Sequence, residues 1–483
     1  MHCDSVVARP RFAPSRARQR GVWVGPALLG ALASPASVSA HGGRPQTYDV
    51  LFDPSDETRV VVPASFGFLV SEDAGATFSL LCTGASPDPR PGTPRPSVIT
   101  PSGTLLVARE LGLLRGPTLG CGLDYVGAEL RGAFFADVVL EPGTEALALR
   151  SDAAVANAIF VVEAGGTRLA PLGTPFPPDF LPERVRTAPS DRRRVWVSGT
   201  ARRPGTAFVD GRIYVSSDRG ASYALHTVPL ELDERRVRVL AIDPRDPDHA
   251  IGVIHARAED RPIELRWSPR SVELRRLGPL EADPARVDRA FGAAFLPDGT
   301  AWLGNDLAGL HALEVSGAVR VIDAALGVSC VVVHGEHVYV CADDLPDALG
   351  DGFAVARQRL GAPYAPEPFL RFIDIAGPRS CGLPSDEVCA TTWPETLADL
   401  GRVGGADAGL DPDAGLAPQD GGGPDDAGPP ASPDTGTAGR DAGAAAPARA
   451  TGCSVAVSAE PTAGVWLLAL ALVMRFARQG RGR

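Results

Sequence analysis

The stretch VLFDPSDETRVVV, residues 50–62, places two apolar runs on either side of a turn rich in Asp, Pro and Ser. Apolar runs that meet at such a turn are typical of two antiparallel strands joined by a tight connection. The same order of residue types returns along the chain at 97–108, 138–149, 185–197, 239–253, 293–304 and 329–341. The sequence therefore predicts seven strand-turn-strand units.

Each unit continues with a further apolar run, such as FGFLVS (66–71) or RIYVSS (212–217), and then a turn and a last strand. The units succeed one another at roughly forty to fifty residues, the length of a four-stranded propeller blade. Long amphipathic helical periodicity is missing, which leaves a propeller, a long sandwich or several small β domains. We predict an all-β fold, a β-propeller over 46–375 with seven blades of four antiparallel strands. Six or eight blades are open alternatives.

Two stretches, SEDAGATF (71–78) and SSDRGASY (216–223), repeat one order of residue types between the third and fourth strands of a unit. In such a turn an Asp can accept backbone N–H groups, a Gly can take a positive φ, and an aromatic ring can pack beneath. The residues expected to hold these two corners are Ser71, Asp73, Gly75, Thr77 and Phe78, and Ser216, Asp218, Gly220, Ser222 and Tyr223. We predict a structural role for both turns rather than catalysis or metal binding.

Both stretches match the pattern Ser-x-Asp-x-Gly-x-Thr/Ser-aromatic at every position, and so resemble the Asp-box, or bacterial neuraminidase repeat (BNR). Families that carry such propellers include sialidases, sortilin-type receptors and proteins similar to photosystem II assembly factors. The resemblance implies a fold more than a function, because one fold hosts many activities.

Six cysteines fall between residues 82 and 389, and an even number in an exported chain indicates disulfides. A two-residue turn at Gly335-Glu336 would set Cys330 opposite Cys341 on two antiparallel strands, within disulfide range. We expect a second bond between Cys381 and Cys389, which would close a small loop. By elimination, a third bond would join Cys82 to Cys121.

The first forty residues have the order of an export signal, with arginines, then the apolar run VWVGPALLGALA (22–33), then small residues before His41. We predict a signal peptide at 1–40 and export to an oxidising compartment. The net charge of −11 and the pI near 5.3 argue against a nucleic-acid partner. The chain contains no Lys, which excludes a phosphate-loop lysine and a lysine Schiff base. No cofactor is expected.

Candidate chemistry is sparse in the sequence. His334 and His337 would share one face beside a hairpin turn with Glu336 nearby, but a zinc-binding His-Glu-x-x-His needs a helix, so we predict no metal site. A sialidase-like hydrolase would need an arginine cluster, a Tyr with an adjacent Glu as nucleophile, and an Asp acid/base. Arginines are plentiful, but no Arg-Ile-Pro motif lies near the first unit, and no catalytic residues can be assigned.

The C-terminal part changes composition after residue 406. We predict a disulfide loop and short helix closing the domain at 376–406. The Asp/Ala/Gly/Pro-rich stretch at 407–450 has too few large apolar side chains to fold and is expected to form a disordered stalk. The remaining segment, 451–483, contains Cys453, the apolar run AGVWLLALALVM (463–474), expected to form a short hydrophobic helix, and an arginine tail.

This last segment resembles the myxobacterial C-terminal sorting domain, MYXO-CTERM, in which a Gly-Cys pair precedes a short hydrophobic helix and an arginine tail. The resemblance implies that Cys453 is the processing and anchoring residue, that a sorting protease in the membrane removes the residues C-terminal to it, and that the mature protein is held at the outer surface. An uncleaved single-span membrane anchor is the alternative.

Together these features favour a monomeric, non-enzymatic, surface-tethered propeller that binds a protein or glycan ligand at one end of its central channel. The alternative is a secreted sialidase-like glycoside hydrolase. Arginines beside a Tyr and two carboxylates in the channel would favour the hydrolase, whereas apolar and scattered polar groups would favour the binding protein.

Overall fold

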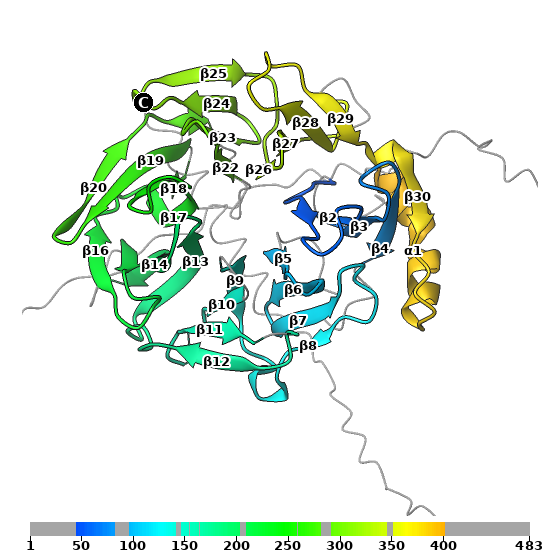
Figure 1. The fold of residues 1–483 in the computed structure, drawn as a ribbon, viewed down its shortest axis with the longest axis horizontal. Coiled ribbons are helices and arrows are strands. Elements are labelled where there is room, and N and C mark those ends of the chain that lie inside the picture. Colours follow the sequence, from blue (N-terminus) through cyan, green and yellow to red (C-terminus); the bar gives the residue numbers. More distant parts are fainter. Residues whose placement is uncertain are drawn as a thin grey trace, which may run out of the picture. The chain divides into compact units, whose positions relative to one another are not determined.

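Seven antiparallel sheets stand around a central axis in the computed structural model (Figure 1). The structure describes residues 45–82, 96–141, 146–153, 155–163, 165–202, 209–257, 259–281, 291–344 and 351–400. They belong to one unit of the chain, Met1–Gly409, and the second unit, Leu410–Arg483, lies outside them. The predicted seven-bladed β-propeller is confirmed. The predicted signal peptide, the stalk, the C-terminal helix and Cys453 lie outside the described residues.

Each blade consists of consecutive strands that run outward from the axis. Blades 1 to 4 contain β1 (Leu51–Phe52), β2 (Val60–Ala64), β3 (Gly67–Ser71) and β4 (Phe78–Cys82); β5 (Ser97–Ile99), β6 (Thr104–Arg109), β7 (Gly112–Pro117) and β8 (Asp124–Tyr125); β9 (Phe135–Leu140), β10 (Ala146–Arg150), β11 (Ile159–Val162) and β12 (Leu169–Leu172); and β13 (Phe180–Ala188), β14 (Asp191–Arg202), β15 (Val209–Ser216) and β16 (Ala224–Val228).

Blades 5 to 7 have the same plan. They contain β17 (Glu234–Ile242), β18 (His249–Ala256), β19 (Glu259–Ser268) and β20 (Ser271–Arg276), with β21 (Leu280–Glu281) also paired to β19; β22 (Phe291–Phe295), β23 (Ala301–Asn305), β24 (Gly309–Leu313) and β25 (Val319–Asp323); and β26 (Cys330–His334), β27 (His337–Cys341), β28 (Val355–Arg359) and β29 (Glu367–Leu370). Two 3₁₀ helices (Ala128–Leu130 and Phe372–Asp374), β30 (Ile375–Pro378) and α1 (Ser385–Asp399) are the other described elements.

The turns between first and second strands explain part of the sequence repeat. In blade 1, Asp53 Oδ1 accepts the backbone N–H of Ser55 at 2.8 Å, and in blade 5 Asp243 Oδ1 accepts that of Arg245 at 2.9 Å. A carboxylate that bonds a backbone N–H two residues ahead stabilises a turn at the point where the strand ends. The shared Asp-Pro sequence thus encodes the same corner in two blades.

The hydrophobic core is divided among the interfaces between neighbouring blades. Seven buried clusters are present in the described part of the chain, and each contains residues of two adjacent blades. For example, Trp196 of blade 4 is fully buried in the same cluster as Val239 of blade 5. Since every blade buries both of its faces, the strands are apolar over most of their length, which accounts for the long Val- and Leu-rich runs in the sequence.

The ring closes through residues at both ends of the propeller. Near the N-terminal end, Thr47 Oγ1 donates to the carbonyl oxygen of Ala354, and Ser329 Oγ donates to the carbonyl oxygen of Thr47, at 2.8 and 2.7 Å. Both partners belong to blade 7. At the C-terminal end, β30 pairs in parallel with β4, the outer strand of blade 1. The chain therefore overlaps itself at the junction of blades 7 and 1.

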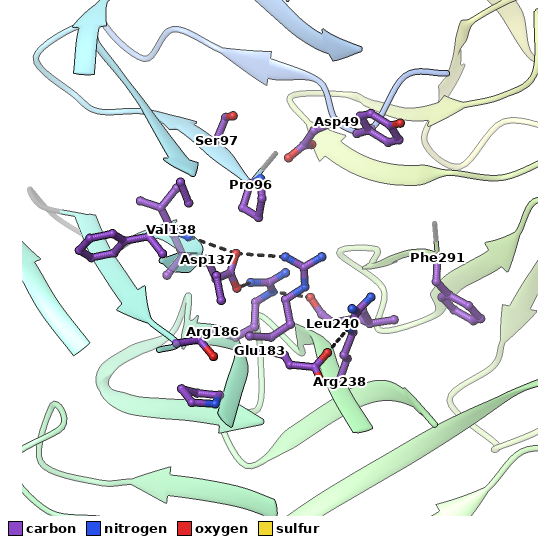
Figure 2. Close-up of a pocket in the computed structure, with 18 of the residues that line it drawn as sticks. Asp49, Pro96, Ser97, Asp137, Val138, Glu183, Arg186, Arg238, Leu240 and Phe291 are labelled. Carbon is purple, nitrogen blue, oxygen red and sulfur yellow. Dashed lines mark hydrogen bonds and ion pairs between the residues drawn. The ribbon is translucent and has the colours of Figure 1, made fainter. Parts of the chain in front are cut away.

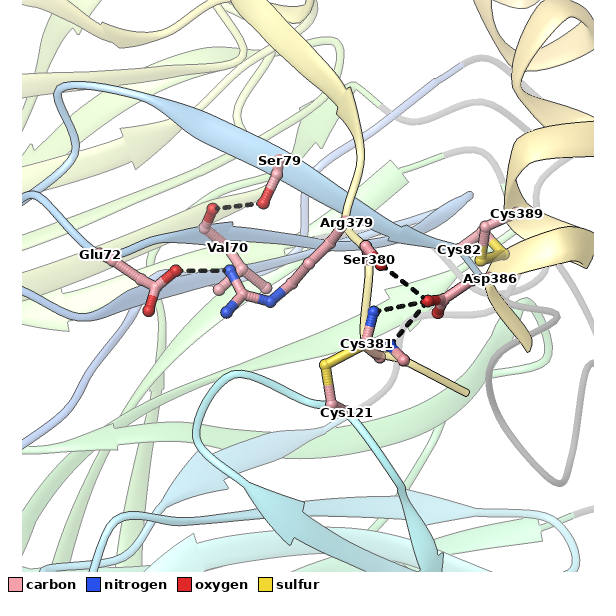
Figure 3. The surroundings of a disulfide bond; sticks show 11 residues. Val70, Glu72, Ser79, Cys82, Cys121, Arg379, Ser380, Cys381, Asp386 and Cys389 are labelled. Atoms are coloured by element: carbon pink, nitrogen blue, oxygen red, sulfur yellow. Dashed lines mark hydrogen bonds and ion pairs between the residues drawn. A yellow bond between two sulfur atoms is a disulfide. The ribbon is translucent and has the colours of Figure 1, made fainter. Parts of the chain in front are cut away.

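Two disulfides fix this C-terminal overlap. Cys389, which is buried in α1, bonds to Cys82 at the end of β4, and Cys381 bonds to Cys121 in blade 2 (Figure 3). Between them, Asp386 Oδ2 accepts the backbone N–H of Cys381 and that of Gly382, both at 2.8 Å. We call β30, α1 and these two disulfides the C-terminal clasp, because they attach the last described segment to blades 1 and 2.

Two of the three predicted pairings were wrong. Cys381 does not bond to Cys389, and Cys82 does not bond to Cys121, because β30 carries the segment along the outer edge of blade 1 and brings each of its cysteines to a different blade. The predicted bond between Cys330 and Cys341 is confirmed. Those two residues face each other in the β26–β27 register, with Cα atoms 4.8 Å apart.

Candidate functional site

A cavity of about 800 Å³ occupies one end of the central channel. Its lining comes mainly from the innermost strands of all seven blades and the residues just before them, and it also includes Ala108, Thr200 and His255 of the second strands β6, β14 and β18. Residues 96–98, 291–293 and 329–331 include the first residues of β5, β22 and β26, so the cavity lies toward the end at which the inner strands begin. We call this end the start face. A cavity of this volume suits a ligand the size of a small saccharide or cofactor.

Charged side chains gather on the wall formed by blades 3 and 4 (Figure 2). Asp137 of β9 is almost fully buried, and its two carboxylate oxygens accept from Arg184 at 3.3 Å and Arg186 at 2.7 Å, both on β13. Asp137 also accepts the backbone N–H of Val185 at 2.9 Å, while Arg186 Nε donates to the carbonyl oxygen of Leu240. One buried carboxylate thus holds two guanidinium groups in the cavity wall.

A second cluster of the same kind lies on blades 4 and 5. Glu183 accepts from Arg238 Nε at 2.8 Å and lies 3.9 Å from Arg236 Nε, and both arginines are on β17. A β-bulge between Pro182 and Arg184 places Glu183 on the cavity side together with its neighbour Arg184. Each cluster therefore pairs one carboxylate with two guanidiniums.

Asp49 reaches the cavity from blade 1, across from the clusters (Figure 2). Its carboxylate accepts the backbone N–H of Val50, and burial raises its pKa to about 6, despite the nearby charges of Arg186 and Arg184, which lower it. Burial disfavours the charged form of a carboxylate because the protein solvates it less well than water. Asp49 is therefore a cavity carboxylate that exchanges its proton close to neutral pH.

Replacing Asp49 with Asn is expected to raise the melting temperature at pH 7.5 and to change it little at pH 4. The folded-state pKa of about 6 lies above the ordinary value of 3.8, so ionisation is harder in the folded protein, and stability falls as the pH rises through this window. The uncharged amide of Asn does not ionise, so the variant avoids the cost of charging this side chain in the folded protein. Thermal melts of the wild type and Asp49→Asn between pH 4 and 7.5 test whether the substitution raises the melting temperature as predicted.

The control for this pair of melts is Asp73, whose hydrogen bonds lower its pKa to about 2. Its carboxylate contributes stability that is present above pH 3.8 and is lost as the pH falls toward 2, so Asp73→Asn should lower the melting temperature at pH 7.5. A lower melting temperature for Asp49→Asn at pH 7.5 would contradict the assignment of a carboxylate whose pKa is raised in the folded protein.

The first predicted corner, between β3 and β4, has a dense set of side-chain hydrogen bonds. Asp73 accepts from Ser71 Oγ at 2.8 Å, from the backbone N–H of Thr77 at 2.8 Å and from Thr77 Oγ1 at 2.6 Å. Gly75, at φ +90°, donates its N–H to Ser71 Oγ and lies against the ring of Phe369 in blade 7. Phe78 packs edge-on against the same ring. This corner therefore also contacts the neighbouring blade at the ring closure.

The second corner, between β15 and β16, repeats these bonds. Asp218 accepts from Ser216 Oγ at 2.7 Å and from the N–H and Oγ of Ser222 at 2.9 and 2.6 Å. Gly220, at φ +86°, donates to Ser216 Oγ, and Tyr223 packs against Tyr214. Both turns join third to fourth strands and so lie at the end opposite the start face, and none of the ten residues lines the cavity. Their structural role stays a prediction.

Asp73→Ala is expected to lower the free energy of unfolding by about 1 kcal/mol, roughly 2 °C in melting temperature, because an exposed turn loses its shared acceptor. Asp218→Ala should do the same in the matching turn. Binding of any ligand in the cavity should be unchanged. Loss of ligand binding at an unchanged melting temperature would contradict the structural role.

The other candidates from the sequence do not assemble into a site. His334 stacks on Phe52 with ring centroids 3.8 Å apart, and it faces His337 across the β26–β27 turn. No group of three or more His, Cys, Asp or Glu side chains that could hold a metal ion occurs among the described residues. Of the tyrosines, Tyr48 lines the cavity.

Sequence reasoning missed the cavity wall, although a signal for it was present. In the inner strands β13 and β17, arginines stand two residues apart, at Arg184 and Arg186 and at Arg236 and Arg238. Alternate residues of a strand share a face, so two charged residues at this spacing inside an apolar run place both charges on one side. In a propeller the innermost strands border the central channel. The charged side of β13 and β17 therefore faces the cavity.

No protein-family model and no curated protein sequence matches the chain. Among solved structures, it is similar to a GH74 enzyme of Niastella koreensis (13% identity, 62% of this chain and 50% of that one, TM-score 0.40). It is also similar to a GH74 xyloglucanase of Xanthomonas campestris (18% identity, 68% of this chain and 53% of that one, TM-score 0.41). A third similar structure is the β-propeller domain of the Trilobed protease of Pyrococcus furiosus (10% identity, 67% of this chain and 100% of that one, TM-score 0.39). The matched region spans about half the length of each GH74 chain, and identities this low concern the fold alone.

Proposed function

We propose that this protein is an exported, surface-tethered propeller that binds a glycan in the start-face cavity without transforming it. The observation that carries the proposal is the pair of guanidinium–carboxylate clusters on β13 and β17, which line one wall of the cavity. Sugar hydroxyl groups both donate and accept hydrogen bonds, and planar guanidiniums held by carboxylates offer fixed donors beside acceptors. A glycan suits such a wall better than a purely apolar ligand does.

The carboxylates of the two clusters favour binding over hydrolysis. Asp137 is held by two arginines and two backbone N–H groups, and Glu183 is held by Arg238 with Arg236 near it. A carboxylate whose lone pairs are engaged in hydrogen bonds is a weak nucleophile. The wall therefore supports a positioning role for both side chains.

The hydrolase is kept as a second candidate because of Asp49. The cavity contains arginines, Tyr48 and carboxylates, the combination expected of a sialidase-like enzyme, and Asp49 has a pKa of about 6, in the range of a general acid. Fluorogenic glycosides assayed with the wild type and with Asp49→Asn separate the two functions. Turnover that disappears in Asp49→Asn would establish hydrolysis, and binding without turnover would establish a binding protein.

The binding proposal is tested by a glycan array with the full-length protein. We expect the wild type to bind at least one glycan and the double variant Arg186→Met/Arg238→Met to lose that binding. The matched control is Arg320→Met, which removes an exposed guanidinium that pairs with Glu314 far from the cavity lining. Equal glycan binding by the wild type and the double variant would refute the proposal.

Export has partial support from the structure. Three disulfides indicate folding in an oxidising environment. Among the described residues, the one α-helix is too short and too polar to span a membrane. The signal peptide at 1–40 and the anchoring role of Cys453 rest on the sequence patterns alone.

Cys453→Ser is expected to release the protein from the cell surface into the medium while leaving its melting temperature unchanged. The reason is that the residue lies outside the propeller and would be needed only for processing and attachment. Cell fractionation followed by immunoblotting measures the distribution. Unchanged surface attachment would exclude Cys453 as the anchoring residue.

A further inference from the structure

One buried side chain in the cavity wall has a polar atom without a partner. His255, near the end of β18, is 7% exposed and lines the cavity. Its Nδ1 lies 2.8 Å from Asp260 Oδ1, but its Nε2 is buried and has no hydrogen-bond partner in the described part of the chain. Leaving a buried polar atom unpaired is unfavourable, so such an atom in a cavity wall points to a ligand.

The neighbours of His255 determine which nitrogen carries the proton. Asn305 Oδ1 accepts the backbone N–H groups of Leu307 and Ala308 at 3.0 and 2.7 Å, so the amide nitrogen of Asn305 is turned toward Asp260. That nitrogen donates to Asp260 Oδ2 at 2.9 Å. Asp260 therefore acts as an acceptor on one side, and as a carboxylate it also accepts from His255 Nδ1–H on the other.

This chain of contacts leaves Nε2 as a bare acceptor. Burial lowers the pKa of His255, which favours the neutral ring, and a neutral imidazole with its proton on Nδ1 has a lone pair on Nε2. Asp260 and Asn305 are fully buried, on strands of blades 5 and 6, so the ring is held by rigid elements rather than by loops. The orientation of the acceptor is thus built into the fold.

The surroundings of Nε2 restrict the kind of ligand. Arg236 is the cross-strand partner of His255, and Arg238 lies near enough for its charge to act on the ring; both arginines line the cavity. A group that meets this part of the wall must donate to the imidazole and accept from guanidiniums. A hydroxyl group does both, whereas a carboxylate has no proton to donate.

We infer that Nε2 of His255 accepts a hydrogen bond from a sugar hydroxyl, so that the glycan bound here is neutral where it contacts the β17–β18 wall. The inference rests on the proposed function. His255 is in this account a specificity-determining residue, and Asp260 and Asn305 are positioning residues that keep the proton on Nδ1.

The test uses the variant His255→Asn. Its amide nitrogen takes the place of Nδ1–H and keeps a donor for Asp260, while the acceptor at Nε2 is lost. The probes are methyl α-glucoside, methyl α-galactoside, methyl α-mannoside and glucuronate, titrated into the full-length protein and followed by ligand-observed NMR. We expect the wild type to prefer at least one neutral glycoside over glucuronate, and His255→Asn to bind that glycoside about tenfold more weakly.

Deoxy analogues of the preferred glycoside identify the hydroxyl. Removing the hydroxyl that contacts His255 should weaken binding to the wild type and make no further difference in His255→Asn, whereas removing any other hydroxyl should affect both proteins alike. Absence of binding by the wild type would overturn the proposed function. Equal binding of the glycoside by the wild type and His255→Asn would overturn this inference and leave the proposed function in place.

A second measurement does not depend on any ligand or on the folding of a variant. Long-range proton–nitrogen NMR of the protein labelled at its eight histidines distinguishes a bare ring nitrogen from a protonated one. We expect His255 to show a bare Nε2 and a protonated Nδ1 at pH 7. A protonated Nε2 would overturn the inference.

Discussion

Replacing the four cysteines of the C-terminal clasp with alanine is expected to lower the free energy of unfolding by at least about 5 kcal/mol, roughly 10 °C in melting temperature. The bonds Cys82–Cys389 and Cys121–Cys381 join residues 307 and 260 positions apart. Cross-links that close such long loops remove much of the conformational entropy of the unfolded chain. Calorimetry of the variant in comparison with the wild type measures the loss.

The matched control is the double variant Cys330→Ala/Cys341→Ala, which removes a bond between residues only 11 positions apart. Because this bond closes a much shorter loop, its removal should cost about 3 kcal/mol. Full reduction of the wild type with dithiothreitol removes all three bonds and should destabilise it more than the clasp variant is destabilised. A clasp variant no less stable than the control would contradict the view that these two disulfides close the ring.

Asp137→Ala is the second substitution with a large expected effect, a loss of about 3–5 kcal/mol of unfolding free energy. Removing the carboxylate leaves Arg184 and Arg186 close together without their shared partner, and it leaves the backbone N–H of Val185 without its acceptor. Two partly buried guanidiniums that lose a buried shared partner cost more than a lost surface pair. We also expect the variant to lose glycan binding, because both guanidiniums lose their fixed position.

Glu314→Ala is the control for that measurement. Glu314 pairs with Arg320 at 3.1 Å, and both side chains are about half exposed, so breaking the pair should change stability by less than about 1 kcal/mol. Denaturant titration of both variants gives the comparison. A loss below about 1 kcal/mol for Asp137→Ala would show that the cluster does not depend on its carboxylate.

The parts of the fold that depend on local sequence were predictable. The seven strand-turn-strand units, the four strands per blade and the bond between Cys330 and Cys341 all depend on strand runs and turns that are contiguous in the chain. The two aromatic corners were also located correctly between third and fourth strands. Local hydrogen bonds, such as those of Asp73, are determined by residues within four positions of one another.

The parts that depend on distant residues were not predictable in the same way. The partners of Cys381 and Cys389 are set by the parallel pairing of β30 with β4, two segments about three hundred residues apart. The cavity wall depends on a carboxylate of β9 meeting arginines of β13, and on His255, Asp260 and Asn305 meeting across two blades. Arginine spacing in the inner strands was a usable signal, but the partners required the ring to be assembled.

Hydrogen–deuterium exchange of the full-length protein with and without a glycan that it binds tests the central claim, that the ligand site is the start-face cavity. We expect slower exchange in peptides that cover 181–186, 236–240 and 47–50, which contain the cavity residues of β13, β17 and blade 1. Slower exchange confined to 71–78 and 216–223, at the opposite end of the propeller, would contradict it.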